Sequence, residues 1–547
     1  MPNKIKCILE PHHKIPIPIL EILVGNIPQV SSTIKEVVEE VIEEPKEETD
    51  GWDKDWSWGA EEDLTLNRTE LTTRSPSPNI PSKDYLISSS GDGRTLVLAY
   101  RTKFIVVQVN SEGEYSAIGQ NLGNSGELIT SVLCLPLFVP STRSTQNYVM
   151  CGYNTGWIRV FSESGVLLTE QQLETTPVLT IKMRTPPPTF KVPAHSQLKE
   201  DEDITILFEG NRVVSIDGQS LWLVLRVCDG QRESGIDASR MHTAFQYKKW
   251  ELQQQDQVKD IVSLGPSPTH SWIPKFSNSN TTLTHALLDA STRYIAVGAY
   301  PMLSYYATAD SSSTLSAASM ATYVMSRVAS PVFSFAKSWW GASANNTANQ
   351  KRAGTPYVPN IPRPPTNIEP ATPIPAVLVA NDSFRQINQI YIGPPSTSSQ
   401  RHTLAATSDA LGRVILWDVL EGEMIRMWKG VRDATCGWVE VLEHELYQQP
   451  SPPGVPKVLQ FLVIHSSKRG ILKIFQMRHG KQVGAFHVGP GWQLVSCARE
   501  PLGSSMVSID RRKKAKGTER CEYGLLSNCL LVGPDGDVRK IKVTLKA

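Results

Sequence analysis

The sequence predicts an all-β fold, a degenerate WD-like β-propeller of about seven blades with a helical insertion and a disordered acidic N-terminal arm. The main observation is the run at residues 404–439, which reads as one β-meander of short strands joined by turns at Gly412 and Gly422. A meander cannot bury both of its faces alone. A second observation is that its strand-turn unit recurs at residues 156–161, 470–475 and 536–541. These copies lie further apart than the roughly 40–45 residues of a strict WD repeat, which predicts long loops.

Residues 1–83 are expected to form a mostly disordered arm. Its first apolar stretch, residues 5–9, is a candidate strand that would complete the last blade and close the ring. Residues 31–49 have helical apolar spacing among acids and are interpreted as a solvated, marginal helix.

Residues 50–63 of the arm place three tryptophans among acidic residues. One interpretation is a docking peptide in which Trp52 and Trp56 anchor a partner, because tryptophan anchors dominate interface energetics. The other is that the indoles fold back onto the propeller.

The propeller is expected over residues 84–547, with strand-rich stretches that supply successive blades. The first four blades are expected at residues 85–109, 128–168, 178–216 and 261–298. The sixth is expected around residues 461–475 and the seventh around residues 495–532. After the third, residues 221–225 fit either a helix or a strand.

An insertion is expected to interrupt the propeller at residues 311–376. Its first part, residues 314–341, has helical apolar spacing and few charges, and a Pro-rich linker follows. A helix packed against the rim or a partner is one interpretation. The other is a membrane-surface helix that contacts lipid through four aromatic residues, Phe333, Phe335, Trp339 and Trp340.

Composition and motifs limit the function. The formal net charge is +1, which argues against a nucleic-acid binder. The eight cysteines include no Cys-x-x-Cys pair and are interpreted as reduced core residues of a cytoplasmic protein. The motifs of phosphate-binding loops, nucleophile elbows and zinc proteases are missing from the sequence. We therefore expect no enzyme activity, no catalytic residue, no cofactor and no metal.

Several motifs resemble one known family. The residues that carry the resemblance include Arg426-Met427-Trp428-Lys429-Gly430, Tyr247-Lys248-Lys249-Trp250 and Arg469-Gly470-Ile471-Leu472. They are similar, in order, to the N-terminal domain of the non-catalytic, regulatory subunit of the Rab-three GTPase-activating protein complex. The resemblance spans roughly residues 50–545 and includes the tryptophan-ending segment at residues 338–341.

The resemblance implies a regulatory scaffold in membrane traffic. Its partners would be the catalytic subunit, which supplies the arginine for GTP hydrolysis, and a Rab-family GTPase, reached directly or through that subunit. The complex is also expected to promote nucleotide exchange, and the chain to be cytoplasmic or peripheral on endoplasmic reticulum or lipid-droplet membranes. Family members continue into a long helical region. A chain ending at Ala547 keeps these functions only if they do not need that region.

A partner surface is predicted on the repeat at residues 404–439, at Arg426, Lys429, Arg432 and Trp438. Trp438 could equally be a core residue with the cations around it. The alternative function is a free-standing propeller adaptor that binds membrane through residues 314–341 without a GTPase partner. Neither the Rab that is served nor the face that binds partners follows from the sequence.

Overall fold

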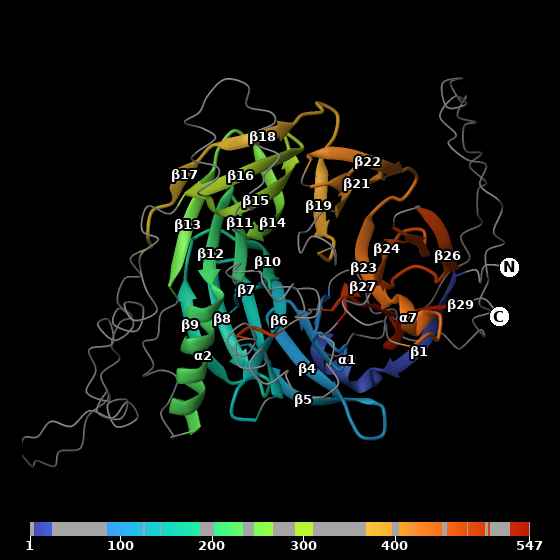
Figure 1. Ribbon diagram of the computed structural model, residues 1–547. Coiled ribbons are helices and arrows are strands. Elements are labelled where there is room, and N and C mark those ends of the chain that lie inside the picture. Colours follow the sequence, from blue (N-terminus) through green and yellow to red (C-terminus); the bar gives the residue numbers. More distant parts are fainter. Residues whose placement is uncertain are drawn as a thin grey trace, which may run out of the picture.

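A computed structural model describes residues 5–24, 85–123, 126–142, 144–185, 202–233, 246–265, 290–309, 368–395, 404–419, 421–450, 457–477, 480–497, 501–503 and 526–545. These residues form seven sheets of four or five strands that surround a common axis (Figure 1). The prediction of an all-β propeller with about seven blades is therefore confirmed.

Within each blade the strands follow one another from the innermost to the outermost in the order named below. Blade 1 contains β2 (Leu86–Ser89), β3 (Thr95–Tyr100), β4 (Lys103–Val109) and β5 (Tyr115–Asn121). Blade 2 contains β6 (Ile129–Val139), β7 (Ser144–Tyr153), β8 (Trp157–Ser162) and β9 (Leu167–Gln172). Blade 3 contains β10 (Val178–Arg184), β11 (Asp203–Phe208), β12 (Arg212–Asp217), β13 (Tyr247–Leu252) and β17 (Thr372–Ile374). Blade 4 contains β14 (Gln257–Gly265), β15 (Ala290–Ala299), β16 (Leu303–Ala309) and β18 (Ala376–Ala380).

The remaining blades follow the same pattern. Blade 5 contains β19 (Ile387–Ile392), β20 (Leu404–Asp409), β21 (Val414–Asp418) and β22 (Glu423–Trp428). Blade 6 contains β23 (Ala434–Leu442), β24 (Val458–Ser466), β25 (Ile471–Gln476) and β26 (Lys481–His487). Blade 7 contains β27 (Gln493–Ser496), β28 (Cys529–Val532), β29 (Asp537–Leu545) and β1 (Ile5–Lys14).

The ring is closed by the two ends of the described chain. The N-terminal strand β1 pairs antiparallel with β29, from Ile5 opposite Leu545 to Lys14 opposite Asp537. Cys7 at the centre of β1 is fully buried among apolar side chains of blades 6 and 7. Because β1 comes from the start of the chain and completes the last blade, this pairing ties the ring together.

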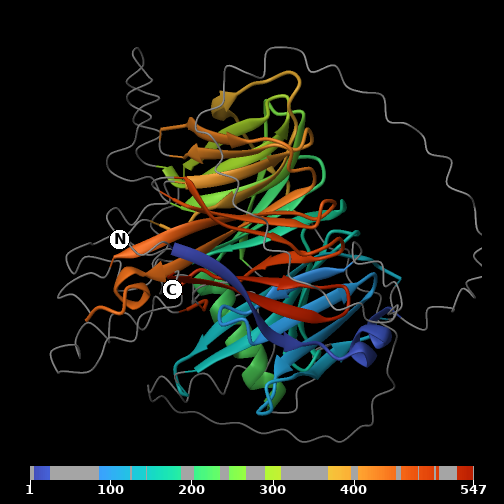
Figure 2. The same cartoon turned by 90° about the vertical axis from the view of Figure 1, so that its right-hand side faces the viewer.

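The connections divide the molecule into two faces. Turns between the second and third strands of a blade, and connections to the next blade, lie on what we call the short-loop face. The other connections lie on the opposite, long-loop face. The helix α1 (Ile17–Val24), which follows β1, lies on the short-loop face, and α7 (Glu443–Leu446) lies on the long-loop face. Figure 2 shows the two on opposite sides, α1 in blue on the right and α7 in orange on the left.

Residues 221–225, which fitted either a helix or a strand, belong to the helix α2 (Gly218–Glu233). Asp217 starts it as a side-chain cap, because its carboxylate accepts a hydrogen bond from the Ser220 N–H at 2.8 Å. Its apolar face packs on β9 and β12 through buried Leu221, Leu225 and Cys228.

Two predicted boundaries are wrong. Residues 434–439 were assigned to the meander of blade 5, but they open blade 6 as part of β23. The chain turns between the two blades at Gly430 and Asp433, whose φ angles are +74° and +50°. The insertion was predicted to reach residue 376, but β17 already pairs in parallel with β13, and Ala376 opens β18.

The described ranges cover only part of the N-terminal arm and seven of the eight cysteines. In the arm, residues 5–24 form β1 and α1, while residues 25–84 lie outside the described residues. The seven cysteines in the described ranges are buried free thiols. None of the helices in the described ranges has the length and apolarity needed to cross a membrane.

Candidate partner-binding surface

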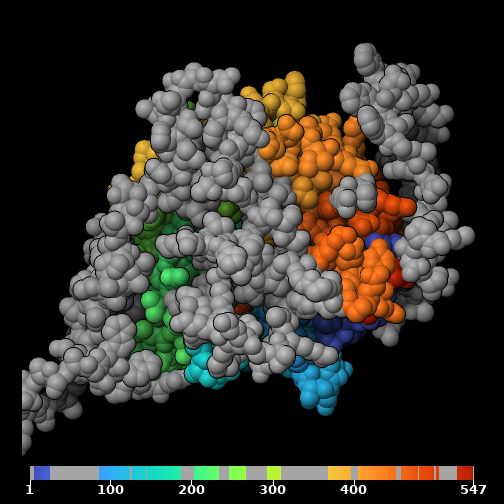
Figure 3. Space-filling model, in the orientation of Figure 1, coloured from blue at the N-terminus to red at the C-terminus, as the bar shows by residue number. Residues whose placement is uncertain are grey.

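The three cationic residues predicted as part of a partner surface lie together at blade 5. Arg426 belongs to β22, Lys429 and Arg432 lie in the loop from β22 to blade 6, and all three are exposed. The Arg426 guanidinium donates a hydrogen bond from Nη1 to the Gly480 carbonyl of blade 6 at 2.8 Å. The surface therefore spans the junction of blades 5 and 6, whose orange atoms lie right of centre in Figure 3.

The same outer strand exposes two apolar side chains, Met424 at 49% and Ile425 at 52%. Neighbours on a strand normally face opposite sides, but here a β-bulge intervenes: Leu416 pairs with Arg426 and Trp417 with Met424, which leaves Ile425 unpaired in the ladder. We call Met424, Ile425, Arg426, Lys429 and Arg432 the blade-5 rim.

Blades 2 and 6 repeat this bulge but bury the bulge residue. The bulge residue is Leu168 in blade 2 and Val483 in blade 6, and these side chains are only 1% and 9% exposed. Helix α2 packs on β9 in blade 2, and β1 packs on β26 in blade 6. In blade 5 the equivalent Ile425 remains exposed, so the rim offers apolar contact area beside its cations.

The prediction of Trp438 as a surface residue is wrong. Trp438 lies on β23, the innermost strand of blade 6, and is 5% exposed. Its indole N–H donates a hydrogen bond to the Tyr391 carbonyl of blade 5 at 3.2 Å. The turn at Gly430 and Asp433 carries the chain from the outside of one blade to the inside of the next, so Trp438 packs between blades instead of facing a partner.

The other predicted contact residues belong to the arm and to the insertion. Trp52 and Trp56 of the arm, and Phe333, Phe335, Trp339 and Trp340 of the insertion, lie outside the described residues. The membrane-binding alternative therefore stays a prediction.

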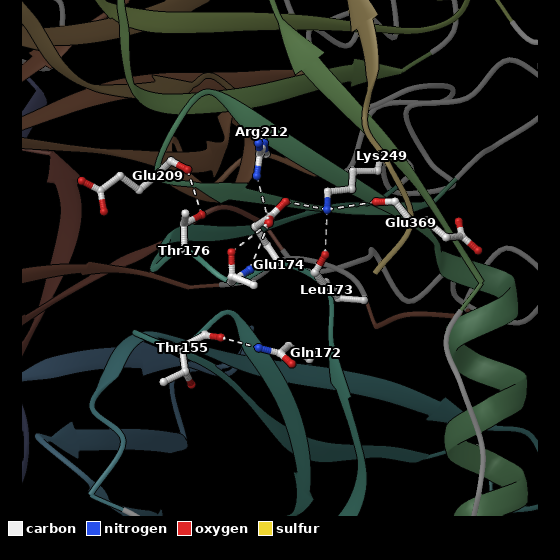
Figure 4. Close-up of polar contacts among 10 residues, drawn as sticks. Thr155, Gln172, Leu173, Glu174, Thr176, Glu209, Arg212, Lys249 and Glu369 are labelled. Carbon is white, nitrogen blue, oxygen red and sulfur yellow. Dashed lines mark hydrogen bonds and ion pairs between the residues drawn. The ribbon is translucent and has the colours of Figure 1, made fainter. Parts of the chain in front are cut away.

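A buried ionic cluster joins blades 2 and 3 (Figure 4). The Lys249 ammonium lies 2.5 Å from Glu174 Oε2, and both side chains are 4% exposed. Arg212 Nη1 lies 2.9 Å from the other carboxylate oxygen, Glu174 Oε1. Glu174 comes from the connection between the blades, Arg212 from β12 and Lys249 from β13.

Lys249 also fixes the chain that returns from the insertion. Its ammonium donates hydrogen bonds to the Leu173 carbonyl at 2.9 Å and to the Glu369 carbonyl at 3.2 Å. A few residues after Glu369, β17 pairs with β13 beside Lys249. The cluster thus positions the exit of the insertion on the outer edge of blade 3.

The cluster keeps Glu174 charged despite its burial. Burial alone would raise the pKa of this carboxyl, but the Lys249 ammonium, the Thr175 N–H and Arg212 outweigh burial and hold the pKa below its usual value. Sequence reasoning missed the cluster because its acid and bases are far apart in the chain. The only signal was the Lys248-Lys249 pair in an otherwise strand-like run, which gave no sign of which lysine is buried.

Acid is expected to destabilise the propeller through His465 on β24. Its ring is fully buried, neither nitrogen has a hydrogen-bond partner among the described residues, and burial lowers its pKa from 6.5 to about 4. Below pH 6.5 the unfolded chain takes up this proton while the folded chain does not, so stability falls between pH 6.5 and 4, by roughly 3 kcal/mol for this group.

Urea unfolding at several pH values measures this loss. The variant His465→Met should lose less stability between pH 6.5 and 4 than the parent chain, and His487→Gln, an exposed histidine on β26, should lose as much as the parent. Equal acid sensitivity of His465→Met and the parent would contradict the assignment.

Within the described ranges no group of three or more His, Cys, Asp or Glu side chains is positioned to hold a metal ion. What the described residues do provide is a closed ring with an exposed rim of mixed apolar and cationic residues. Fold and surface together define a WD-like β-propeller domain.

The particular family follows from comparison. The family model described as Rab3 GTPase-activating protein regulatory subunit N-terminus matches residues 83–495, and the chain belongs to this family. The family predicted from the sequence is thereby confirmed.

The chain is also similar to two individual proteins. The Rab3 GTPase-activating protein regulatory subunit of Caenorhabditis elegans is 30% identical over 83 residues, which are 15% of this chain and 6% of that protein. The match thus spans a small part of that relative. The crystal structure of Saccharomyces cerevisiae Sqt1 is similar with a TM-score of 0.35 and 12% identity over 84% of each chain.

Proposed function

We propose that this chain is a non-catalytic, regulatory propeller of a Rab GTPase-activating complex in membrane traffic. It binds the catalytic subunit of the complex, and through that subunit a Rab-family GTPase. The observation that supports this most is the family match over residues 83–495, on a fold whose outer strand in blade 5 exposes apolar and cationic side chains.

The blade-5 rim is the surface proposed to bind the catalytic subunit. Apolar residues at the centre of an interface provide most of the binding free energy, and charges around them provide orientation and specificity. Ile425 and Met424 provide the first kind of contact and Arg426 the second. Since Arg426 already bonds to Gly480, its guanidinium is held in place before a partner arrives.

Co-purification with the catalytic subunit tests the proposal. The double variant Ile425→Asp/Arg426→Glu should recover at least tenfold less catalytic subunit than the parent chain, because it removes an apolar anchor and reverses a charge. The matched control is Ile118→Asp, the equivalent bulge residue in blade 1, which is 36% exposed and should have no effect.

The proposal also concerns activity. The chain alone should not accelerate GTP hydrolysis by any Rab, whereas hydrolysis in the presence of the catalytic subunit should depend on the chain. Failure to recover a catalytic subunit, or GTP hydrolysis by the purified chain, would contradict the proposed role.

A further inference from the structure

A second exposed surface lies on the short-loop face, at the ends of blades 4 and 5. Its most prominent residue is Phe384, which is 87% exposed. Phe384 lies in a tight turn, in which the Asp382 carboxylate accepts the Phe384 N–H at 3.1 Å and the Asp382 carbonyl accepts the Arg385 N–H at 3.2 Å. Arg385 Nε in turn lies 3.6 Å from the buried Asp409 carboxylate. The turn therefore presents the ring to solvent from a fixed position.

Two more apolar side chains accompany Phe384. Leu411 is 52% exposed and Tyr300 is 57% exposed, each on a neighbouring turn. The turns are joined by hydrogen bonds: the Ala410 N–H donates to the Gln386 carbonyl at 2.9 Å, and the Gln386 side chain donates to Gln257 at 3.1 Å. The backbone beside Gln257 bonds in turn to the Tyr300 carbonyl, at 2.9 Å from Asp256 N. The three apolar side chains thus belong to one connected set of turns.

Cations border this set on the side of blade 6. Arg432 packs on the turn that holds Leu411, since a Cβ placed on Gly412 would lie 2.8 Å from Arg432 Cγ. Arg469 follows on the next turn and is exposed. Among the described residues neither arginine makes an ion pair. The nearby carboxylate of Asp433 forms an ion pair with the Lys468 ammonium at 2.8 Å. We call Tyr300, Phe384, Leu411, Arg432 and Arg469 the short-loop patch; it shares Arg432 with the blade-5 rim.

A ligand of this patch should combine large apolar side chains with carboxylates. The sequence contains one such segment: residues 50–63 include three tryptophans and six acidic residues against a single lysine. The described chain leaves the propeller at Val24, at the end of α1 on the short-loop face, and re-enters at Tyr85 to begin blade 1 from the same face. The segment is thus attached on both sides to the face that holds the patch.

The length of chain allows the contact. More than twenty residues lie between Val24 and Asp50, and more than twenty between Asp63 and Tyr85. Extended, such a length spans roughly 70 Å. Strands spaced about 4.8 Å apart in four-stranded blades give a propeller radius of roughly 25 Å, so the segment can reach across the face.

We propose that residues 50–63 bind the short-loop patch of their own chain, with the indoles against Phe384, Leu411 and Tyr300 and the carboxylates toward Arg432 and Arg469. This selects the second of the two interpretations of the tryptophan segment, folding back onto the propeller. The proposal does not depend on the identity of the catalytic partner.

The test uses a fluorescein-labelled synthetic peptide of residues 50–63 and the full chain carrying Trp52→Ala, Trp56→Ala and Trp58→Ala, which frees the patch of its own segment. Fluorescence anisotropy should show saturable binding that weakens as salt rises. Adding Phe384→Ala or Arg469→Glu to the chain should weaken binding at least tenfold. Leu223→Ala and Arg232→Glu, exposed positions on α2, serve as matched controls and should leave it unchanged.

Two results would overturn the proposal. One is the absence of saturable binding by the peptide. The other is binding that Phe384→Ala and Arg469→Glu leave intact. If Phe384→Ala instead abolishes co-purification with the catalytic subunit while the peptide does not bind, the patch has a different occupant and the proposal is wrong. Because the rim test uses Ile425 and Arg426 and the patch test uses Phe384 and Arg469, each can fail without the other.

Discussion

Replacing Lys249 with methionine is expected to lower the free energy of unfolding by about 3–5 kcal/mol, as for other buried pairs that lose one partner. Methionine has a similar length but no charge, so the only charged partner of Glu174 left among the described residues would be Arg212, whose side chain is 39% exposed. The Leu173 and Glu369 carbonyls would also lose their donor. Urea denaturation followed by tryptophan fluorescence measures the loss.

A matched variant and a double variant make this test specific. Lys248→Met changes the adjacent, exposed lysine of β13 and should cost less than about 0.5 kcal/mol. The double variant Glu174→Gln/Lys249→Met removes the uncompensated charge and should recover part of the stability. Additive effects of the two substitutions would show that the pair is not coupled and would contradict the description of the cluster.

The variant Cys7→Asp should open the ring. Cys7 is fully buried in β1, and burial raises the pKa of its thiol to about 12, so a carboxylate at this position would be strongly desolvated. We expect a loss of about 4 kcal/mol or detachment of β1 from β29. Hydrogen exchange of the β29 amides distinguishes a loss of overall stability from detachment of β1, because detachment exposes the β29 amides in an otherwise folded protein.

The control for ring closure is Lys6→Asp, the neighbouring residue on the opposite side of the same strand. Its side chain is half-buried, and the substitution should cost about 1 kcal/mol or less. Unchanged protection of β29 and unchanged stability in Cys7→Asp would mean that β1 does not hold the ring together.

Much of the fold was predictable because strands and turns leave local signals. Alternating apolar residues and turn glycines such as Gly412 located the blades, and the apolar run in residues 5–9 pointed to the closing strand. Two features were hidden from this kind of reasoning. The blade to which residues 434–439 belong depends on a turn at Asp433, a non-glycine residue with positive φ. The return of β17 onto blade 3 depends on a parallel pairing between residues more than a hundred positions apart.

The candidate surface was predictable only in part. Positive charge at Arg426, Lys429 and Arg432 was visible in the sequence, but the exposure of Ile425 was not. It results from a bulge and from the lack of a covering element such as those on blades 2 and 6. Trp438 shows the opposite error. A tryptophan beside cations fits a partner surface and a core position equally well, and only the order of strands in the blades decides between them.

Hydrogen exchange of the full chain, alone and with the catalytic subunit of the complex, tests the central claim most directly. We expect complex formation to slow exchange at the backbone amides of β22 and of residues 429–432, and to leave exchange at the amides of β5 in blade 1 unchanged. Formation of a complex with no added protection on blade 5, or protection confined to other blades, would contradict it.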